Sequence, residues 1–375
     1  MAFLGIDNLK FFVGVVEDRN DPSKLGRLRV RCLGIHTSDK NKMATADLPW
    51  ASVSLPVTSS GISGIGQSPS FIVEGSWVWG YFRDGSFLMQ ELVVVGTLPG
   101  RPSELGDPNK GFYDPNRRST DEDEDDYDIS VYPRNIAEPD TNRLAVNDTT
   151  KEHTSLTARK SARITGIPTA DFDAVGNNIT ASDTDTWNQP EIAYAAVYPY
   201  NHVFESESGH IKEYDDSFVI NENGVRTNYY RIHERHTSGT GYEITNNGDK
   251  IDIITNDHYT LTSNNNKAYI QGNSDITIAG RHKIYVNKDG QSNNHYDIQV
   301  GPNANVNIQV DNGNLNVVTK TGQFNFDVGA DFNVNVGGNY NLTVLGNKVE
   351  TIEGNHTQDT TGAVTIKGST IDLNP

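Results

Sequence analysis

A glycine recurs every eight residues toward the C-terminus of this 375-residue chain, and this spacing limits the possible folds more than any other feature. Apolar and polar residues alternate between the glycines, as in DFNVNV at 331–336. Alternation with a period of two is typical of a strand with one apolar face, so the region is an internal repeat of short strands. Gly272 and Gly280 have the same spacing, and we predict stacked short strands from about residue 251 onward. The glycine row itself comprises Gly322, Ala330, Gly338, Gly346, Gly354 and Gly362.

One face of the repeat is apolar, and the residues between its members are mostly Asn, Asp and Thr. The apolar face falters near the C-terminal end, where Lys348, Glu350 and His356 occupy its positions and Leu345 and Val349 stand in the other phase. A register adjustment or a polar-lined section is expected there. The regular apolar row comprises Phe324, Phe326, Val328, Phe332, Val334, Val336, Tyr340, Leu342 and Val344.

The length of the repeat predicts the architecture. Eight residues make about 26 Å of strand, so a triangular coil from one chain would have sides of about 9 Å, whereas two packed sheets need about 10 Å between them. Three chains that each supply one side would enclose their apolar rows on a common axis, with glycines at the corners. We therefore predict an intertwined, homotrimeric β-prism. Two alternatives fit the repeat less well. A calcium-binding repeat has a period of nine and regular aspartates, and an amyloid-like stack would not need such regular glycines.

Residues 1–100 predict a different all-β element. Leu28, Val30 and Cys32 alternate with Arg27, Arg29 and Arg31, which indicates a half-buried strand with outward arginines. Trp50 and Trp77 are expected in the core or at an interface. Five apolar stretches separated by turn residues predict a small barrel: 11–16, 27–35, 48–57, 75–82 and 88–97.

Residues 101–195 are rich in proline, aspartate and threonine and include the acidic run DEDEDDYD at 121–128. Such a segment has too little apolar surface to offset the entropy of ordering, so we interpret it as an extended linker. The β signal returns from residue 196. The predicted domains are therefore a barrel (1–100), a linker (101–195), a β-rich collar (196–250) and a repeat needle (251–375).

Charge and cysteine content exclude several classes of function. The chain carries 49 acidic and 31 basic residues, a net charge of -18, so nucleic acid is not an expected partner. Its one cysteine, Cys32, excludes a disulfide framework within the chain. No signal peptide and no apolar run long enough for a membrane helix is visible, so we expect a soluble chain.

Motifs for catalysis are missing from the sequence, and we predict neither an enzyme nor a cofactor. His233 and His236 of HERH would lie on opposite faces of a strand, so a surface pair is expected rather than a zinc site. No nucleophile elbow or phosphate-binding loop occurs. No metal site is assigned. The weak candidate is His356, which three chains would bring to one axis, but it has no carboxylate companion.

Two further stretches carry a family resemblance. They resemble the central spike protein of T-even-like contractile-tailed phages, which is related to the valine-glycine-repeat spike of type VI secretion. The two stretches are FFVGVVEDRNDPSKLGRLRVRCLGIHT and YPYNHVFESESGHIKEYDD. The specific blocks are Val-Glu-Asp-Arg and Glu-Ser-Gly-His, the latter being Glu207, Ser208, Gly209 and His210. The resemblance implies an OB-fold barrel that docks on a baseplate hub ring and a trimeric β-helical needle.

The resemblance also implies a role in the virion. A trimer at the centre of the tail baseplate would pierce the host outer membrane when the sheath contracts, and a small cap protein could bind at its C-terminus. The best-known members carry a muramidase domain between barrel and needle, and residues 101–195 are too few for one. We therefore expect piercing without hydrolysis. The alternative is a peripheral tail spike that binds a receptor or carbohydrate. OB barrels in general bind oligosaccharides or oligonucleotides, but the fold alone does not assign that function, and we expect this barrel to dock on the hub.

Overall fold

The structure, a computed structural model, describes residues 9–104, 107, 109–113, 137–147, 194–274, 276, 278, 280–287, 290 and 294–372. It divides into two compact units, Met1–His282 and Lys283–Pro375. The acidic run at 121–128, most of the predicted linker and Pro375 lie outside the described residues. No helix among the described residues is long and apolar enough to cross a membrane.

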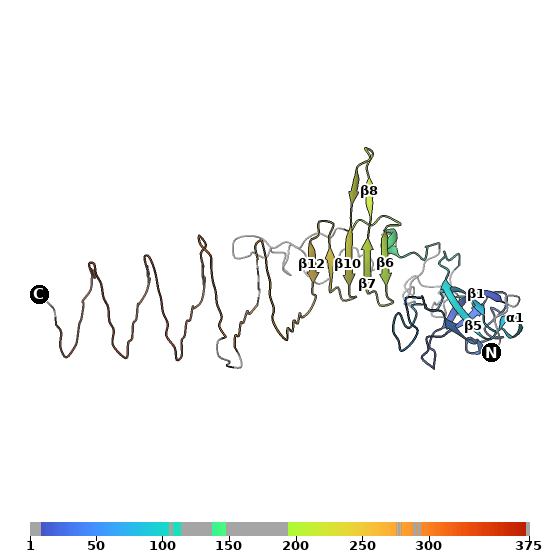
Figure 1. The fold of residues 1–375 in the computed structure, drawn as a ribbon, viewed down its shortest axis with the longest axis horizontal. Helices are drawn as coiled ribbons and strands as arrows, with labels where there is room; N and C mark the ends of the chain where they lie inside the picture. The colour runs from blue at the N-terminus through green and yellow to red at the C-terminus, as the bar shows by residue number, and fades with distance from the viewer. Residues whose placement is uncertain are drawn as a thin grey trace, which may run out of the picture. The chain divides into compact units, whose positions relative to one another are not determined.

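Five strands close into a barrel in the N-terminal region, as predicted (Figure 1). Their order around the barrel is β1-β2-β3-β5-β4, and the pair β3/β5 is parallel whereas the others are antiparallel. Two short helical turns, Thr45–Asp47 and α1 (Gly85–Leu88), lie in the connections. The strands are β1 (Lys10–Asp18), β2 (Leu28–Cys32), β3 (Trp50–Val53), β4 (Trp77–Phe82) and β5 (Leu92–Thr97).

The barrel has a continuous apolar core because alternate residues of each strand point inward. Phe12 and Phe82 pack with ring centroids 5.2 Å apart at its centre. Gly80 lets β4 and β5 approach closely, since a Cβ there would meet the Val93 backbone and would lie 2.9 Å from Phe12 Cζ. The core cluster comprises Phe12, Val16, Leu28, Val30, Cys32, Ala51, Val78, Phe82, Leu92 and Val94.

A second, five-stranded antiparallel sheet follows in the order β12-β11-β10-β7-β6. A two-stranded hairpin, β8 (Phe218–Ile220) and β9 (Arg226–Asn228), projects from the sheet between β7 and β10 (Figure 1). The short helix α2 (Arg143–Val146) packs through Leu144 against Ile211. The five strands are β6 (Asn201–Glu205), β7 (Ile211–Asp215), β10 (Arg231–Arg235), β11 (Gly241–Ile244) and β12 (Lys250–Ile253).

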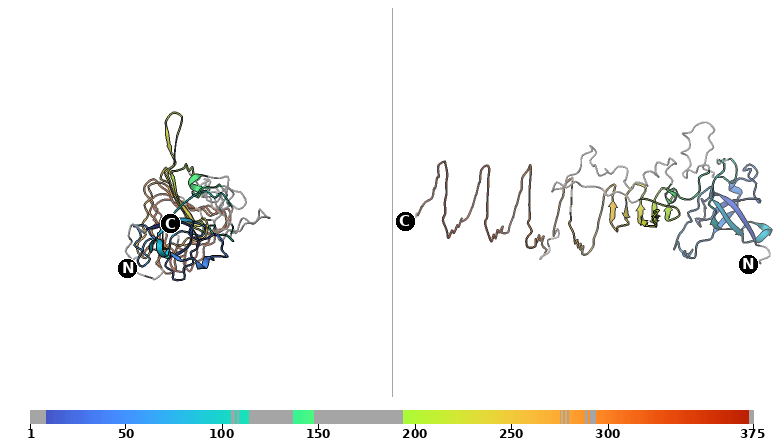
Figure 2. Two further views of the ribbon diagram at one scale, coloured as in Figure 1. Left: turned by 90° about the vertical axis from the view of Figure 1, so that its right-hand side faces the viewer. Right: turned by 90° about the horizontal axis from the view of Figure 1, so that it is seen from above.

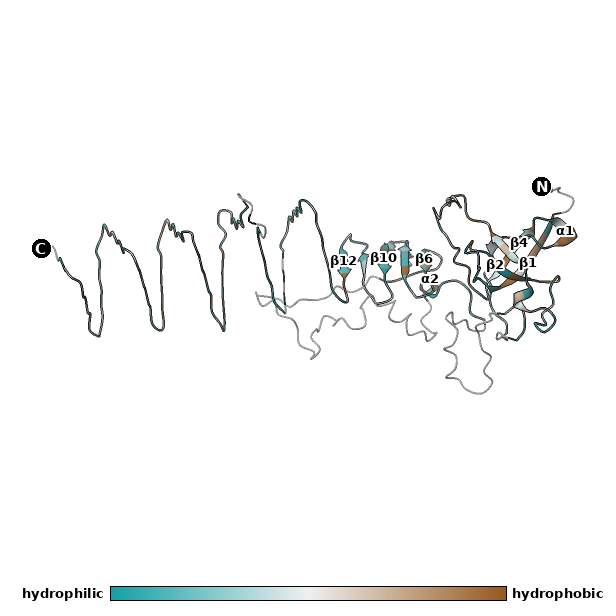
Figure 3. Ribbon diagram, turned by 90° about the horizontal axis from the view of Figure 1, so that it is seen from below, coloured by the Kyte–Doolittle hydropathy of each residue, from teal (hydrophilic) through white to brown (hydrophobic). Residues whose placement is uncertain are grey.

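The two sheets differ in the character of their strands. Figure 3 shows hydrophobic colour along the barrel strands, whereas the strands from β6 to β12 are mostly hydrophilic. The second sheet is more hydrophilic because most of the buried positions of β7 and β10 carry charged side chains.

The octad repeat appears as six extended residues followed by a two-residue bend. Figures 1 and 2 show residues 294–372 as extended runs separated by sharp bends, with no helix and no strand ladder. The predicted glycine row coincides with these bends, as small residues at chain reversals should. The bends at the glycine row lie at 320–322, 329–330, 337–338, 345–346, 353–354 and 361–362.

Candidate functional site: unpaired octad segments and a buried ionic cluster

The apolar row of the octads is uncovered in a single chain. Every described residue from 283 to 372 is exposed, and Phe332 keeps 63% of its surface accessible. Leu345 and Val349, in the other phase, are more exposed still, at 102% and 85%. A soluble protein rarely presents a contiguous apolar surface of this length to water, so the row is a candidate assembly surface.

The backbone of the same region is also unpaired. Among the described residues after Thr255, one backbone–backbone hydrogen bond forms, from Gly290 N–H to the Asn287 carbonyl. Extended segments present donors and acceptors on both edges, and such groups normally pair with another strand. The octads therefore offer an apolar face and two ladder edges at once.

The C-terminal octads include the predicted polar section. Lys348 Nζ lies 2.8 Å from Glu350 Oε2, and this hydrogen bond is the main cause that lowers the pKa of Glu350. No group of three or more His, Cys, Asp or Glu in the described part of the chain could hold a metal ion. His356 could ligate a metal only together with other copies of the chain, and this stays a prediction.

The buried face of the second sheet holds an ionic cluster. Arg231 is fully buried on β10, with Nη2 2.8 Å from Glu213 Oε1 and Nη1 3.2 Å from Glu243 Oε2. His233 Nδ1 lies 2.7 Å from Glu213 Oε2, and Asn201 Nδ2 donates to Glu213 Oε1 at 2.9 Å. Burial alone would raise the pKa of Glu213, but the hydrogen bond with His233 and the charge of Arg231 lower it overall.

The expectation of a surface pair at His233 and His236 is therefore wrong for His233, which is buried beside Glu213. His236, one residue beyond the end of β10, is exposed, and its ring packs against the His210 ring with centroids 4.4 Å apart and planes tilted by 43°. The alternation within one strand does not show that Glu213, on another strand, pairs with the imidazole of His233 and so compensates for its burial.

The family-motif residues form the tight turn between β6 and β7. Gly209 adopts φ 85°, which a glycine accommodates without strain, and its N–H donates to Ser206 O at 2.9 Å. His210 N–H donates to Ser206 Oγ at 3.1 Å, and His210 Nδ1 accepts from Thr237 N–H at 3.2 Å. Glu207 and Ser208 stand at the tip of this turn. These contacts hold the turn in its conformation.

The prediction of outward barrel arginines is wrong for Arg31, whereas Arg27 and Arg29 are half-buried. Arg31 is fully buried and donates to Glu17, Nε–Oε1 2.6 Å. Arg27 pairs with Asp21 at 2.7 Å, and Arg29 Cζ lies 4.6 Å from the centroid of the Trp50 ring. All three arginines therefore have partners within the barrel. Trp50 and Trp77 are half-buried and lie outside the apolar core cluster.

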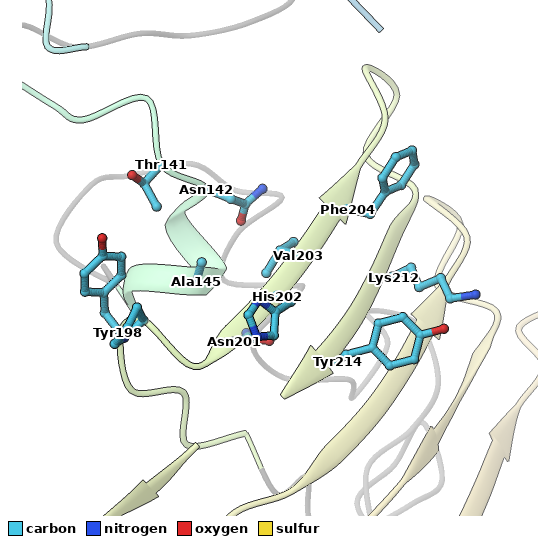
Figure 4. Close-up of a pocket in the computed structure, with 11 residues that line it drawn as sticks. Thr141, Asn142, Ala145, Tyr198, Asn201, His202, Val203, Phe204, Lys212 and Tyr214 are labelled. Atoms are coloured by element: carbon cyan, nitrogen blue, oxygen red, sulfur yellow. The ribbon is translucent and has the colours of Figure 1, made fainter. Parts of the chain in front are cut away.

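A shallow open groove of about 420 Å³ lies beside α2 and the β6–β7 hairpin. Figure 4 shows Tyr198 on the α2 side and Phe204, Lys212 and Tyr214 on the two strands. None of its lining residues is Asp or Glu. The groove therefore lacks the pair of carboxylates with which most glycoside hydrolases cleave their substrates.

The alternation of charged residues in β7 and β10 is the signal of the ionic cluster in the sequence. Charged or ionisable residues recur at every second position of β7 (Glu213, Asp215) and of β10 (Arg231, His233, Arg235). Two neighbouring strands with complementary alternation are expected to pair across one face.

The family model for the Gp5 N-terminal OB domain matches residues 34–193, which include β3 to β5 of the barrel. Protein Gp5 of Vibrio phage KVP40 is 35% identical over 311 residues, covering 76% of this chain and 66% of that protein. The pre-baseplate central spike protein Gp5 of Enterobacteria phage T4 is 45% identical over 114 residues, 29% of this chain and 20% of that protein. These matches and the closed barrel show that the chain belongs to the Gp5 family of phage baseplate central spike proteins.

Proposed function

We propose that this chain is a trimeric central spike at the centre of the tail baseplate and that it pierces the host outer membrane when the sheath contracts. The names of its relatives support a structural role in the baseplate. The observation that carries the trimer is the complete exposure of the octad segments in one chain.

Three chains would satisfy what one chain leaves open. Each buried apolar side chain contributes about 1.5 to 3 kcal/mol, so burying the nine regular positions in three copies supplies tens of kcal/mol before entropy is subtracted. The unpaired backbone edges of one chain would pair with the edges of the two others. A trimer would therefore cover the exposed apolar row and pair the backbone edges of the octads at the same time.

A braided shaft suits a piercing role. If each strand pairs with strands of the two other chains, axial load is shared by many hydrogen bonds that must break together. The polar outer residues, mostly Asn, Asp and Thr, would keep the shaft soluble before contact with the host envelope. In this proposal, residues 1–100 dock on a hub ring, 101–195 link, 196–250 form a collar and 251–375 form the needle.

We further propose that the chain has no muramidase activity of its own. The 95 residues from 101 to 195 are few for a hydrolase domain, and the groove beside α2 has no carboxylate lining. A hub ring around the barrel and a small cap protein at the C-terminus are the proposed partners. Hydrolysis of the cell wall would then come from another protein.

Native mass spectrometry and sedimentation of the purified full chain test the trimer, which should persist at micromolar concentration. Incubation with host peptidoglycan should release no soluble muropeptides, with hen lysozyme as the positive control. Gold-labelled antibodies against residues 355–372 should bind on the tail axis in electron micrographs of virions. A stable monomer, or labelling at the tail periphery, would reject the proposal.

A further inference from the structure

The end of the β6–β7 hairpin contacts two separate segments of the barrel. The hairpin contributes Phe204 and Glu207, the loop before β4 contributes Phe71 and Glu74, and Arg19 follows the end of β1. Arg19 and Glu207 are 188 residues apart in the sequence. The two family blocks, Val-Glu-Asp-Arg and Glu-Ser-Gly-His, thus meet in space.

The polar part of this contact centres on one guanidinium. Arg19 Nη1 and Nη2 bind both carboxylate oxygens of Glu207, with Nη2–Oε2 at 3.1 Å, while Nε lies 3.2 Å from Glu74 Oε2. The side chain of Glu74 is 9% exposed, whereas Arg19 and Glu207 are 33% and 39% exposed. A bidentate pair fixes the orientation of both partners, which a single surface ion pair does not.

The apolar part lies beside it. The Phe71 ring meets the Phe204 ring edge to face, with centroids 4.9 Å apart and planes at 89°. This geometry is the favoured one for aromatic pairs. Because Phe71 and Glu74 belong to one short loop, and Phe204 and Glu207 to one hairpin, the two contacts orient the same two segments relative to each other.

We propose that Arg19, Glu74, Glu207, Phe71 and Phe204 form a clamp that fixes the barrel to the second sheet. Force applied to the barrel then reaches the sheet directly through side chains, in addition to the chain that connects them in sequence. The role in force transfer rests on the proposed piercing function. The clamp itself is a property of the folded chain and can be tested separately.

Hydrogen–deuterium exchange on the full chain tests the clamp. Glu207→Arg places two guanidinium groups together, so amides in 70–76 and 203–211 should exchange about threefold to tenfold faster than in the wild type. Arg19→Glu should accelerate exchange in the same two segments, because the new carboxylate would face those of Glu74 and Glu207. Arg19→Glu combined with Glu207→Arg restores opposite charges and should recover part of the protection. The matched control is Arg83→Glu, whose exposed partner Glu91 lies in the same barrel at 2.7 Å.

The outcomes separate the clamp from the function. Accelerated exchange in both segments for the single variants, recovery in the double variant and no change for Arg83→Glu support the clamp. Unchanged exchange in 70–76 for Glu207→Arg, or no recovery in the double variant, overturns it. Circular dichroism checks that each variant is folded, and general acceleration across the barrel also counts against a local clamp. A wild type that sediments as a monomer while showing this pattern would reject the trimer and leave the clamp standing.

Discussion

Arg31 and Glu17 form a fully buried ion pair in the wall of the barrel, with Nε–Oε1 at 2.6 Å and Nη2–Oε2 at 3.1 Å. Thr45 Oγ1 also donates to Glu17, and Arg31 donates to two backbone carbonyls. Burial by itself would raise the pKa of Glu17, but the hydrogen bonds from Arg31 and Thr45 lower it overall. The pair is tolerated inside the barrel because its hydrogen-bonding groups have partners.

Glu17→Ala should destabilise the barrel by about 3 to 5 kcal/mol, because it leaves the Arg31 charge buried without its partner. Urea unfolding followed by tryptophan fluorescence measures the change in the free energy of unfolding. Arg83→Ala is the control, since its ion pair with Glu91 is exposed, and it should cost less than about 1 kcal/mol. Equal effects of the two variants would contradict a structural role for the buried pair.

Gly80→Ala should destabilise the barrel by about 1 to 3 kcal/mol or more through overpacking. The added Cβ would meet the Val93 backbone, which cannot move without breaking the β4–β5 ladder. At Gly100 an added Cβ meets nothing within 4 Å, so Gly100→Ala is the matched control. Differential scanning calorimetry should show a lower unfolding temperature for the first variant alone.

Acid should weaken the second sheet through Glu213. Its folded-state pKa lies below the ordinary value of 4.5, so the stabilisation is present above that value and is lost as the pH falls through the lowered folded-state pKa. Glu213→Gln should therefore reduce stability at neutral pH and flatten the loss of stability below about pH 4.5. Urea unfolding at several pH values measures both effects. A pH profile parallel to that of the wild type would show that Glu213 does not contribute to acid sensitivity.

The thiol of Cys32 should be inert in the folded chain. Burial raises its pKa to about 12, and its side chain belongs to the barrel core. The thiolate is the reactive form, so iodoacetamide at pH 8 should leave the native protein unmodified and add one label after unfolding in urea. Intact mass spectrometry detects the label. Rapid modification of the native protein would indicate that β2 opens to solvent.

The barrel strands and the positions of the octad bends were predictable from the sequence because their signals are local. Alternation and turn residues lie within ten residues of each other, and the bends fall at the predicted glycine row from Gly322 to Gly362. The buried charges were not predictable in the same way. Arg31 and His233 can be buried because they pair with Glu17 and Glu213. These partners are 14 and 20 residues away in the sequence and come close only after the strands pair. The same holds for Arg19 and Glu207.

Two neighbouring residues of one octad should differ strongly in their response to substitution by aspartate. Val334 belongs to the apolar row, whereas Asn333 points to the other face because successive strand residues alternate. Val334→Asp would place three carboxylates inside the proposed prism and remove about 5 to 9 kcal/mol of apolar burial over three chains, in addition to the cost of burying charge. Asn333→Asp adds the same charge to the outer face, so its effect should be small.

Native mass spectrometry of the two variants should therefore show loss of trimer, or trimer that dissociates on mild heating, for Val334→Asp alone. The pair isolates the face of the strand, because both variants add one negative charge per chain at adjacent positions of one extended segment. If Val334→Asp kept the wild-type trimer and its thermal stability, the apolar row could not line a shared interior. The braided architecture would then need another explanation for the uncovered octads.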